Sequence, residues 1–471
     1  MHSYRWRFPY SRLWIVILSP ILGFLLLRHL LNPNFGARVP YWNTGETHPA
    51  PNNSHVGHSD CRQIPGMEDV LVIIKTGVTE ALDKVPVHIQ TTLRCVPHYV
   101  IFSDFEERIA GVRAHDVLRN VSHEIKQTNP DFGIYNRLRE HGRPGLLDDD
   151  LIDEANSPSG KLNNPGWKLD KWKFVPMIDE ALRIRPDAKW YFFMEADTYP
   201  FWPNLMAWLA QFNPEKPLYI GSQMQIGDVT FAYGGAGTII SNPAMRKVSE
   251  YRAAHSAEID EFTAMHWAGD CVLGKVLHDA GVNLLWAWPM MQTSTIWGVD
   301  FFADAYGRKA WCYPAVSFHH LTPADIELLW QFDQQWFGEK GKFLLLHSDA
   351  FRELIEGDLV APLDDWDNFS DDAGEVSDDG QQLQSFASLS DCEARCTKDP
   401  ECLQYSFKEG KCLTSKMVKR GVSSSDVQSA WMTDRINAKL RVTVGISPPE
   451  GGILIFILLA SGLVTRPPTW E

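Results

Sequence analysis

The chain has 471 residues, of which 44% are hydrophobic and 12% aromatic, enough for two or three folded domains, one of which can have a large core. Its formal net charge is −15. Nucleic acid is therefore not expected to be its main partner, because a polyanion is bound through clustered lysine and arginine side chains.

The first 60 residues predict a membrane anchor followed by a stem. Leu13–Leu27 is mainly apolar, and three arginines precede it, which keeps the N-terminus cytoplasmic. The run approaches the ~20 residues of a span only if it extends to Leu31. We expect a cytoplasmic tail at 1–12, a signal-anchor helix at 13–31 and a stem at 32–60. A cleaved signal peptide is the alternative, although no small-x-small cleavage site follows the apolar run.

Cysteines and glycosylation sequons agree with a luminal location. The cysteines number eight, an even count that is typical of a compartment where disulfides form. Sequons for N-glycosylation begin at Asn52, Asn120 and Asn368. We expect a single-pass type II protein of the Golgi membrane with its catalytic domain in the lumen.

The globular pattern opens with a strand, a helix and a second strand. Val70–Lys75 and Tyr99–Ser103 are apolar runs of buried-strand length, with room for a helix between them. This order predicts a parallel βαβ unit. Ligands of an open parallel sheet bind at the carboxyl ends of its strands, which are here Lys75-Thr76 and Asp104.

The following segments continue an α/β pattern. Residues 105–166 are polar and irregular, and 168–183 predicts a helix that Pro176 must start or kink. Trp190–Met194 predicts a buried strand that runs into Glu195. Further strands are expected at Pro217–Gly221, within Thr230–Ser241 and at Asn283–Trp288, and a helix at Gly269–His278.

A candidate metal site follows the third strand. Glu195 and Asp197 are two carboxylates at i and i+2 of a turn, where both can face one cation such as Mn²⁺. Such an ion can bridge to a nucleotide diphosphate and neutralise its charge. Acid-x-acid triplets are frequent, and for this pattern alone a solvated turn is the more common explanation.

Further polar residues occur in an order that suits glycosyl transfer. Asp270 begins a predicted helix after the glycines Gly234 and Gly235, and His319 ends another apolar strand. Each also has an ordinary explanation. An acid at a helix N-terminus complements the dipole, a histidine can be satisfied within a core, and glycines permit a tight connection.

Five ordered motifs resemble the core 1 β1,3-galactosyltransferases and Fringe-type enzymes of glycosyltransferase family 31, over about residues 66–335. The motifs are Lys189–Tyr199, Pro217–Gly221, Gly234–Gly237, Asp270–Gly274 and Ala315–His319. The resemblance implies a GT-A fold over 61–350, which is an α/β, Rossmann-like nucleotide-sugar-binding domain. It further implies a UDP-sugar donor, Mn²⁺ or another divalent cation, and inversion at the anomeric carbon.

The resemblance also implies roles for single residues. Asp197 matches the direct metal ligand, His319 the histidine that completes the metal site, and Asp270 the general base. Contacts with the nucleotide-sugar are implied for Lys75, Thr76, Asp104, Glu195, Gly234 and Gly235. The usual three acids are here Glu, Ala and Asp, so one carboxylate is lost and a lower metal affinity is expected.

The function implied is transfer of galactose, or alternatively N-acetylglucosamine, from a UDP-sugar to a hydroxyl of a glycan on a luminal acceptor, in a β1,3 linkage. The general base would contribute about 10²–10⁴-fold to the rate. The alternative function is a catalytically silent, membrane-anchored protein that binds carbohydrate or protein.

The C-terminal part predicts a linker and a small disulfide-stapled domain. Ten acids and no lysine or arginine lie between Glu356 and Asp379, so we expect an exposed linker at 351–380. A calcium loop is the alternative, but nothing matches EF-hand spacing. The four cysteines that follow suit disulfides, or a zinc site as the alternative, and they are Cys392, Cys396, Cys402 and Cys412.

This stretch resembles the α+β PAN/Apple family, and we place such a module at 381–440. The resemblance implies the disulfides Cys392–Cys412 and Cys396–Cys402 and a protein- or carbohydrate-binding role, with packing against the enzyme as the alternative. In the core we expect Cys61–Cys95 and Cys271–Cys312. The tail 441–471 stays unassigned.

Overall fold

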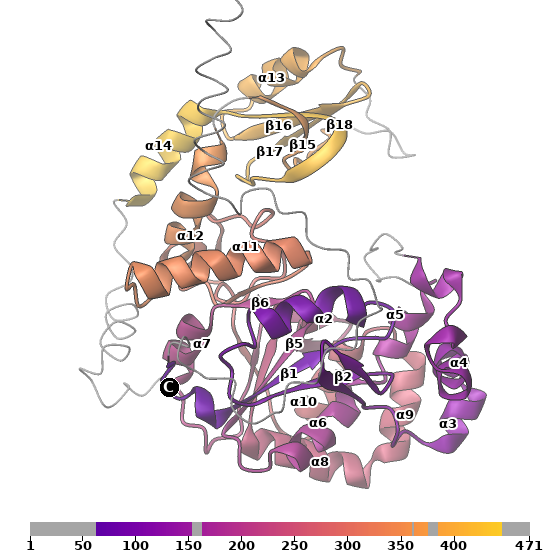
Figure 1. The fold of residues 1–471 in the computed structure, drawn as a ribbon. Helices are drawn as coiled ribbons and strands as arrows, with labels where there is room; N and C mark the ends of the chain where they lie inside the picture. The colour runs from indigo at the N-terminus through magenta and orange to yellow at the C-terminus, as the bar shows by residue number, and fades with distance from the viewer. Residues whose placement is uncertain (1–62, 153–162, 360–361, 375–384, 445–471) are drawn as a thin grey trace, which may run out of the picture. The chain divides into compact units, whose positions relative to one another are not determined.

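The structure of the protein is a computed structural model that describes residues 63–152, 163–359, 362–374 and 385–444 (Figure 1). The predicted cytoplasmic tail, anchor and stem lie outside these residues, as does the tail beyond 444. Among the described residues, no helix is both long enough and apolar enough to cross a bilayer.

An eight-stranded mixed sheet forms the centre of the larger domain, in the order β11-β7-β10-β5-β1-β2-β4-β3. Its strands are β1 Val70–Lys75, β2 Tyr99–Ser103, β3 Glu107–Ile109, β4 Val112–Asp116, β5 Trp190–Glu195, β7 Tyr219–Gly221, β10 Thr238–Ser241 and β11 Leu284–Trp286. Strand β1 pairs in parallel with both β2 and β5, while β10 runs antiparallel between β5 and β7. The predicted α/β fold is confirmed.

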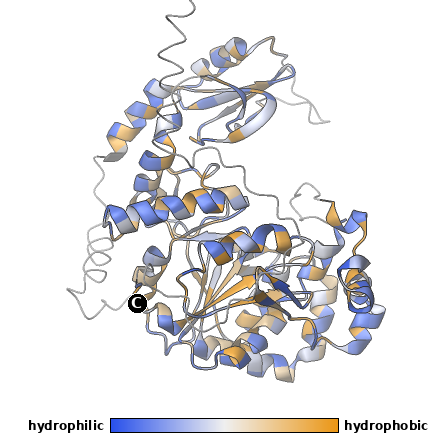
Figure 2. Ribbon diagram, viewed as in Figure 1, coloured by the Kyte–Doolittle hydropathy of each residue, from blue (hydrophilic) through white to orange (hydrophobic). Residues whose placement is uncertain are grey.

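Helices cover both faces of this sheet (Figure 1), and the alternation of side chains along β1 shows why. Leu71 and Ile73 pack into one hydrophobic cluster, which contains side chains of α6 (Phe174–Ile184), α8 (Asn242–Ala254) and α10 (Gly269–Asp279). Val70, Val72 and Ile74 pack into the opposite cluster with side chains of α2 (Ala81–Gln90) and α7 (Trp202–Leu209). A strand buried on both faces needs apolar residues at successive positions, as β1 has from Val70 to Ile74 (Figure 2).

The helices of this domain follow the predicted pattern with two differences. They are α2 Ala81–Gln90, α3 His123–Thr128, α4 Gly133–His141, α5 Pro165–Asp170, α6 Phe174–Ile184, α7 Trp202–Leu209, α8 Asn242–Ala254, α9 Ser256–Met265, α10 Gly269–Asp279, α11 Pro323–Asp333 and α12 His347–Leu354. The helix expected over 168–183 is divided into α5 and α6, and Pro176 lies in the first turn of α6, where a missing N–H costs little.

The second difference concerns the segment between β2 and α5, which was predicted from the sequence to be irregular. It contains the β3–β4 hairpin and helices α3 and α4. Ala110 and Gly111 both have positive φ, at 46° and 84°, and form the tight turn of this hairpin. Short strands with mixed burial leave little periodicity in the sequence, so the prediction of irregular structure was wrong here.

The C-terminal module is a four-stranded antiparallel sheet, in the order β15-β18-β16-β17, with one helix attached. Its elements are β15 Leu363–Asp367, α13 Leu389–Lys398, β16 Gln404–Lys408, β17 Lys411–Ser415 and β18 Val422–Trp431, and α14 Thr433–Val444 follows. The implied disulfides Cys392–Cys412 and Cys396–Cys402 are both confirmed. The zinc alternative is wrong, since these bonds use all four sulfurs.

Strand β15 lies inside the segment predicted to be an exposed linker, so that prediction is wrong for Leu363–Asp367. Leu363 and Trp366 pack against a hydrophobic cluster, whereas the carboxylates of Asp364 and Asp365 are exposed. The high acid content therefore marks the outer side of a strand. Asp365 has φ of 52°, at the point where the pairing of β15 with β18 is irregular.

One sequon and one disulfide prediction also need correction. Asn368 is fully buried, and its Nδ2 donates hydrogen bonds to the carbonyl oxygens of Tyr405 (3.1 Å) and Ala430 (3.2 Å), so it is no glycan acceptor in the folded protein. Cys271 and Cys312 are free, buried thiols that pack in separate hydrophobic clusters. Cys95 is disulfide-bonded, and its predicted partner Cys61 lies outside the described residues.

The module and the larger domain share a hydrophobic cluster. It combines Ile296 and Phe332 of the larger domain with Trp431 and Ile436 of the C-terminal segment. The guanidinium of Arg420 lies 4.6 Å from the ring centre of Trp297 and 4.9 Å from that of Trp366. Its Nε donates to a carboxylate oxygen of Asp358 at 2.5 Å.

Candidate metal centre and active site

Two short strands bring distant parts of the chain together at the carboxyl end of β5. Strand β14 Ser317–Phe318 pairs antiparallel with β6 Tyr199–Pro200. Beyond β14, the amide of Leu321 donates to the carbonyl oxygen of Asp197 at 3.0 Å. The pairing therefore places His319 beside Asp197, although 122 positions separate them (319 − 197).

The imidazole of His319 faces both acids of the triplet. Its Nε2 lies 3.0 Å from Asp197 Oδ1 and 3.6 Å from Glu195 Oε2. The side chain is buried, yet neither ring nitrogen makes a hydrogen bond of acceptable geometry. Asp197, His319 and His320 each present a ligand atom, all within 4.8 Å of one another. Buried nitrogen without a hydrogen bond beside a carboxylate fits a divalent cation.

The two acids of this cluster have the charge that cation binding needs, whereas His319 must give up a proton when an ion binds. Burial alone would lower the pKa of His319, but the carboxylates of Asp197 and Glu195 outweigh it and raise the pKa to about 9. Burial would raise the pKa of Glu195, but Lys75 and His319 lower it to about 2. The pKa of Asp197 is also lowered, by His319 and Lys84 against the effect of burial. Both acids thus stay ionised at neutral pH, the form that binds metal.

The two predicted glycines lie against the polar side chains of the site. A Cβ on Gly235 would lie 2.0 Å from Cε1 of His319, so only glycine allows the ring to approach this backbone. The amide of Gly234 donates to Asp270 Oδ2 at 3.0 Å. Thr198 Oγ1 donates to the carbonyl oxygen of Gly235 at 2.7 Å, which fixes the turn. In the structure, these two glycines therefore position His319 and Asp270.

Gly235→Ala should therefore displace the His319 ring and lower the affinity for a divalent cation by about tenfold or more. Removing a residue that orients a metal ligand has an effect of this size. Gly227→Ala is the matched control for folding, since nothing lies within 4 Å of its Cβ position, although its φ of 59° adds some strain. Isothermal titration with Mn²⁺ would measure the affinity. Equal affinity in Gly235→Ala and the wild type would show that the His319 position does not matter.

Asp270 lies in the first turn of α10 on the other side of the acids. Its Oδ1 accepts from the amide of Cys271 at 2.9 Å, and burial, together with the charge of Glu195, raises its pKa to about 6. It lines a narrow pocket at the carboxyl end of the sheet. The other lining residues are Lys75, Phe174, Met177, Phe193, Met194, Glu195, Ala232, Gly234, Thr238 and Leu273.

Lys75 and Asp104 belong to a buried ionic network beside this pocket. Lys75 Nζ lies 2.5 Å from Asp170 Oδ2 and 3.2 Å from Glu195 Oε1. Lys173 Nζ lies 2.9 Å from Asp104 Oδ2 and 3.2 Å from Asp170 Oδ1. The ammonium of Lys173 also donates to the carbonyl oxygen of Thr76 at 2.8 Å.

The network changes the interpretation of two predicted nucleotide contacts. Asp104 uses one carboxylate oxygen for the amide of Val78, at 2.8 Å, and the other for Lys173. These contacts fit a positioning role for Asp104, which holds the loop after β1. Thr76 contributes its backbone carbonyl to the same loop, so both residues shape this part of the pocket wall from within the protein.

Sequence reasoning missed four charged or polar residues of the site, namely His320, Lys84, Asp170 and Lys173. Lys84 Nζ lies 3.2 Å from Asp197 Oδ2 and 2.8 Å from Glu80 Oε2. Lys84 was missed because nothing in the local sequence indicates that α2 packs beside Glu195 and Asp197. His320 could have been found, because it directly follows a predicted ligand.

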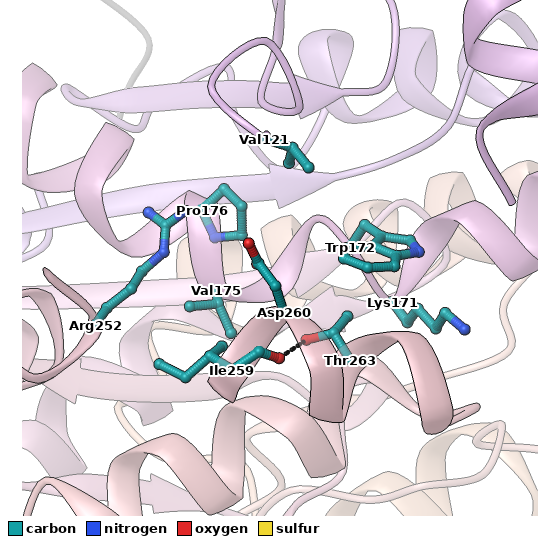
Figure 3. A pocket seen from close by; sticks show the side chains of 9 residues that line it. All are labelled: Val121, Lys171, Trp172, Val175, Pro176, Arg252, Ile259, Asp260 and Thr263. Carbon is teal, nitrogen blue, oxygen red and sulfur yellow. Dashed lines mark hydrogen bonds between the residues drawn. The ribbon is translucent and has the colours of Figure 1, made fainter. Parts of the chain in front are cut away.

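A second small pocket lies away from these residues, under helix α9 (Figure 3). Thr263 Oγ1, at its edge, donates to the carbonyl oxygen of Ile259 at 2.7 Å. Arg252, which also lines it, is paired with Asp179. None of the predicted site residues lines this pocket.

Residues 170–291 of the chain match a family model described as Fringe-like. The matched segment includes β5 with Glu195 and Asp197, the two glycines, and Asp270. Lys75, Asp104 and His319 lie outside it.

Proposed function

We propose, because residues 170–291 match a Fringe-like family model, that the protein is a metal-dependent, inverting glycosyltransferase. It transfers galactose, or alternatively N-acetylglucosamine, from a UDP-sugar to a hydroxyl of an acceptor glycan, with a β1,3 linkage. The observation that carries the proposal is the convergence of Asp197 and His319 beside a pocket that contains Asp270.

Asp270 is the general base of the proposed reaction. As the acceptor oxygen forms its bond to the anomeric carbon, the hydroxyl proton passes to the Asp270 carboxylate. The bond between that carbon and the diphosphate breaks, and its electron pair leaves with UDP. A single displacement inverts the anomeric configuration. A pKa of about 6 keeps the carboxylate ionised near neutral pH while leaving it basic enough to accept a proton.

The positive charges of the site face the leaving diphosphate in this proposal. Lys75 and Lys84 are held near the acids, each by ion pairs with two carboxylates. Asp197 and His319 would hold a divalent cation such as Mn²⁺, which when bound neutralises charge on a diphosphate. Preorganised charge of this kind is usually the largest contribution to such catalysis.

We further propose that the protein acts in the secretory pathway, as a type II protein of the Golgi membrane. The disulfides of the C-terminal module support an oxidising compartment. The module is a candidate site for an acceptor protein or glycan. The predicted anchor at 13–31 would keep the catalytic domain in the lumen.

A second candidate function is a silent carbohydrate- or protein-binding protein. It is favoured by Ala196, which is buried and offers no ligand atom between the two acids. An enzyme and a silent binder differ in whether nucleotide binding depends on the metal site.

Asp197→Ala tests the proposal directly. We expect Mn²⁺-dependent binding of UDP to weaken by at least about tenfold, because the variant removes the only carboxylate of the three-residue cluster. Isothermal titration of UDP with and without Mn²⁺ would measure this, with the exposed Asp304→Ala as matched control. If UDP bound equally without metal and in Asp197→Ala, the proposed function would be wrong. If UDP binding does depend on Mn²⁺ and on Asp197, a panel of UDP-sugars, scored for hydrolysis and transfer, would identify the donor.

A further inference from the structure

We propose that His320 is a third protein ligand of the cation, so that the metal site consists of one carboxylate and two imidazoles from Asp197, His319 and His320. This inference rests on the proposed function and deepens it, because it assigns the ligand set and the ion preference of that site. The three ligand atoms lie within 4.8 Å of one another. Ligands about 2.1 Å from a common ion lie roughly 3 to 3.5 Å apart, so small side-chain movements suffice.

The backbone at His320 explains how two consecutive histidines can share one ion. Consecutive side chains of a strand point to opposite faces. His320 instead has φ of 59°, in the left-handed region, directly after β14. Its ring centre consequently lies 3.9 Å from that of His319. A positive φ is uncommon outside glycine, although histidine is one of the residue types that adopt it more often. At this position it brings the His320 ring to the same side as His319, next to Asp197.

Hydrogen bonds on both sides hold this turn. The amide of His319 donates to the carbonyl oxygen of Ser294 at 3.1 Å, and that of Leu321 donates to Asp197. Tyr233 contacts both rings, since its hydroxyl lies 3.4 Å from His320 Nε2 and its ring packs edge-on against His319. Partners of this kind orient metal-binding imidazoles.

The neighbouring acids leave room for a nitrogen ligand. Ala196 has no side-chain ligand atom, and its carbonyl oxygen lies 2.9 Å from His88 Nε2. Glu195 is paired with Lys75 at 3.2 Å. Asp197 is also paired, with Lys84 at 3.2 Å, but it is the acid whose oxygen lies in the cluster with the two imidazoles. His320 supplies the ligand that a further carboxylate would otherwise provide. Two imidazoles favour Co²⁺ and Zn²⁺, whereas Mg²⁺ prefers oxygen, so the site should discriminate against Mg²⁺.

The test uses the full chain and three metal ions as probes. Pulsed EPR with Cu²⁺ should detect two coordinated imidazoles in the wild type and one in His320→Asn and His320→Gly. Titration should show Co²⁺ affinity falling about 10- to 100-fold in both variants, a loss on the scale measured for metal-site residues. Mg²⁺ affinity should change much less. Asparagine and glycine both accept the left-handed backbone, so neither variant should lose its fold.

His278→Asn is the matched control, because that imidazole is exposed and lies outside the cluster. A single imidazole in the wild type, or unchanged Co²⁺ affinity in both His320 variants, would overturn the inference while Mn²⁺-dependent UDP binding through Asp197 persisted. If the wild type bound no divalent cation at all, the inference and the proposed function would both be wrong.

Discussion

Asp270→Asn is expected to reduce the rate of sugar transfer by about 10²–10⁴-fold, the usual contribution of a positioned general base. The amide cannot accept a proton, but it keeps the size of the side chain, and its single oxygen can still accept from the amide of Gly234 while the hydrogen bond from Cys271 is lost. Binding of Mn²⁺ and UDP should therefore change little. Transfer rates at saturating donor, compared with titration of UDP, would separate the two effects. If UDP binding fell by as much as the transfer rate, Asp270 would instead have a positioning role.

The same carboxylate should set the acid limb of the pH profile. Burial raises its pKa from the ordinary 3.8 to about 6, and the protonated acid cannot act as a base. Activity should consequently be full above this pKa and fall about tenfold per pH unit below it. Initial rates between pH 4.5 and 8 would show this, with circular dichroism to confirm that the fold persists. If activity fell only near pH 4, a group other than Asp270 would control the acid limb of the profile.

Lys173→Met should destabilise the larger domain by about 3–5 kcal/mol, the cost of breaking a buried ion pair from one side. The ammonium is buried and contacts Asp104, Asp170 and the carbonyl oxygen of Thr76. Without it, the buried carboxylate of Asp104 loses its charged partner. Urea unfolding followed by tryptophan fluorescence would measure the change.

Lys168→Met is the matched control for this prediction, because Lys168 is exposed on the neighbouring helix. Adding Asp104→Asn to Lys173→Met should restore part of the lost stability, since it removes the unpaired charge. If both methionine variants unfolded at the same urea concentration, the network would not be a source of stability.

The central strands could be predicted because burial on both faces makes each a continuous apolar run. Val70–Lys75 and Trp190–Glu195 are examples, and the acids after the second strand mark its functional end. The candidate site residues Asp197, Asp270 and His319 were predicted from motifs in a fixed order. Their spatial relation depends on pairing between β6 and β14, two strands of two residues each, which are too short to leave a pattern.

The remaining features depend on tertiary contacts that no local pattern encodes. Lys173 lies among ordinary charged residues, and only the fold reveals that it is buried between two acids. The acids around β15 resembled an unstructured linker because their alternation with Leu363 and Trp366 is brief. Cys271 and Cys312 were paired by position along the chain, but they lie in different hydrophobic clusters.

The position of Arg420 between two tryptophans has a consequence for the way this protein can be divided. Trp297 comes from the larger domain and Trp366 from the module, and the adjacent amide of Gly421 donates to the carbonyl oxygen of Trp297 at 3.0 Å. A shortened enzyme that ends near residue 360 would expose the apolar side chains that Trp431 and Ile436 now cover. Such a fragment would be prone to aggregate, so recombination in evolution would tend to transfer both halves together.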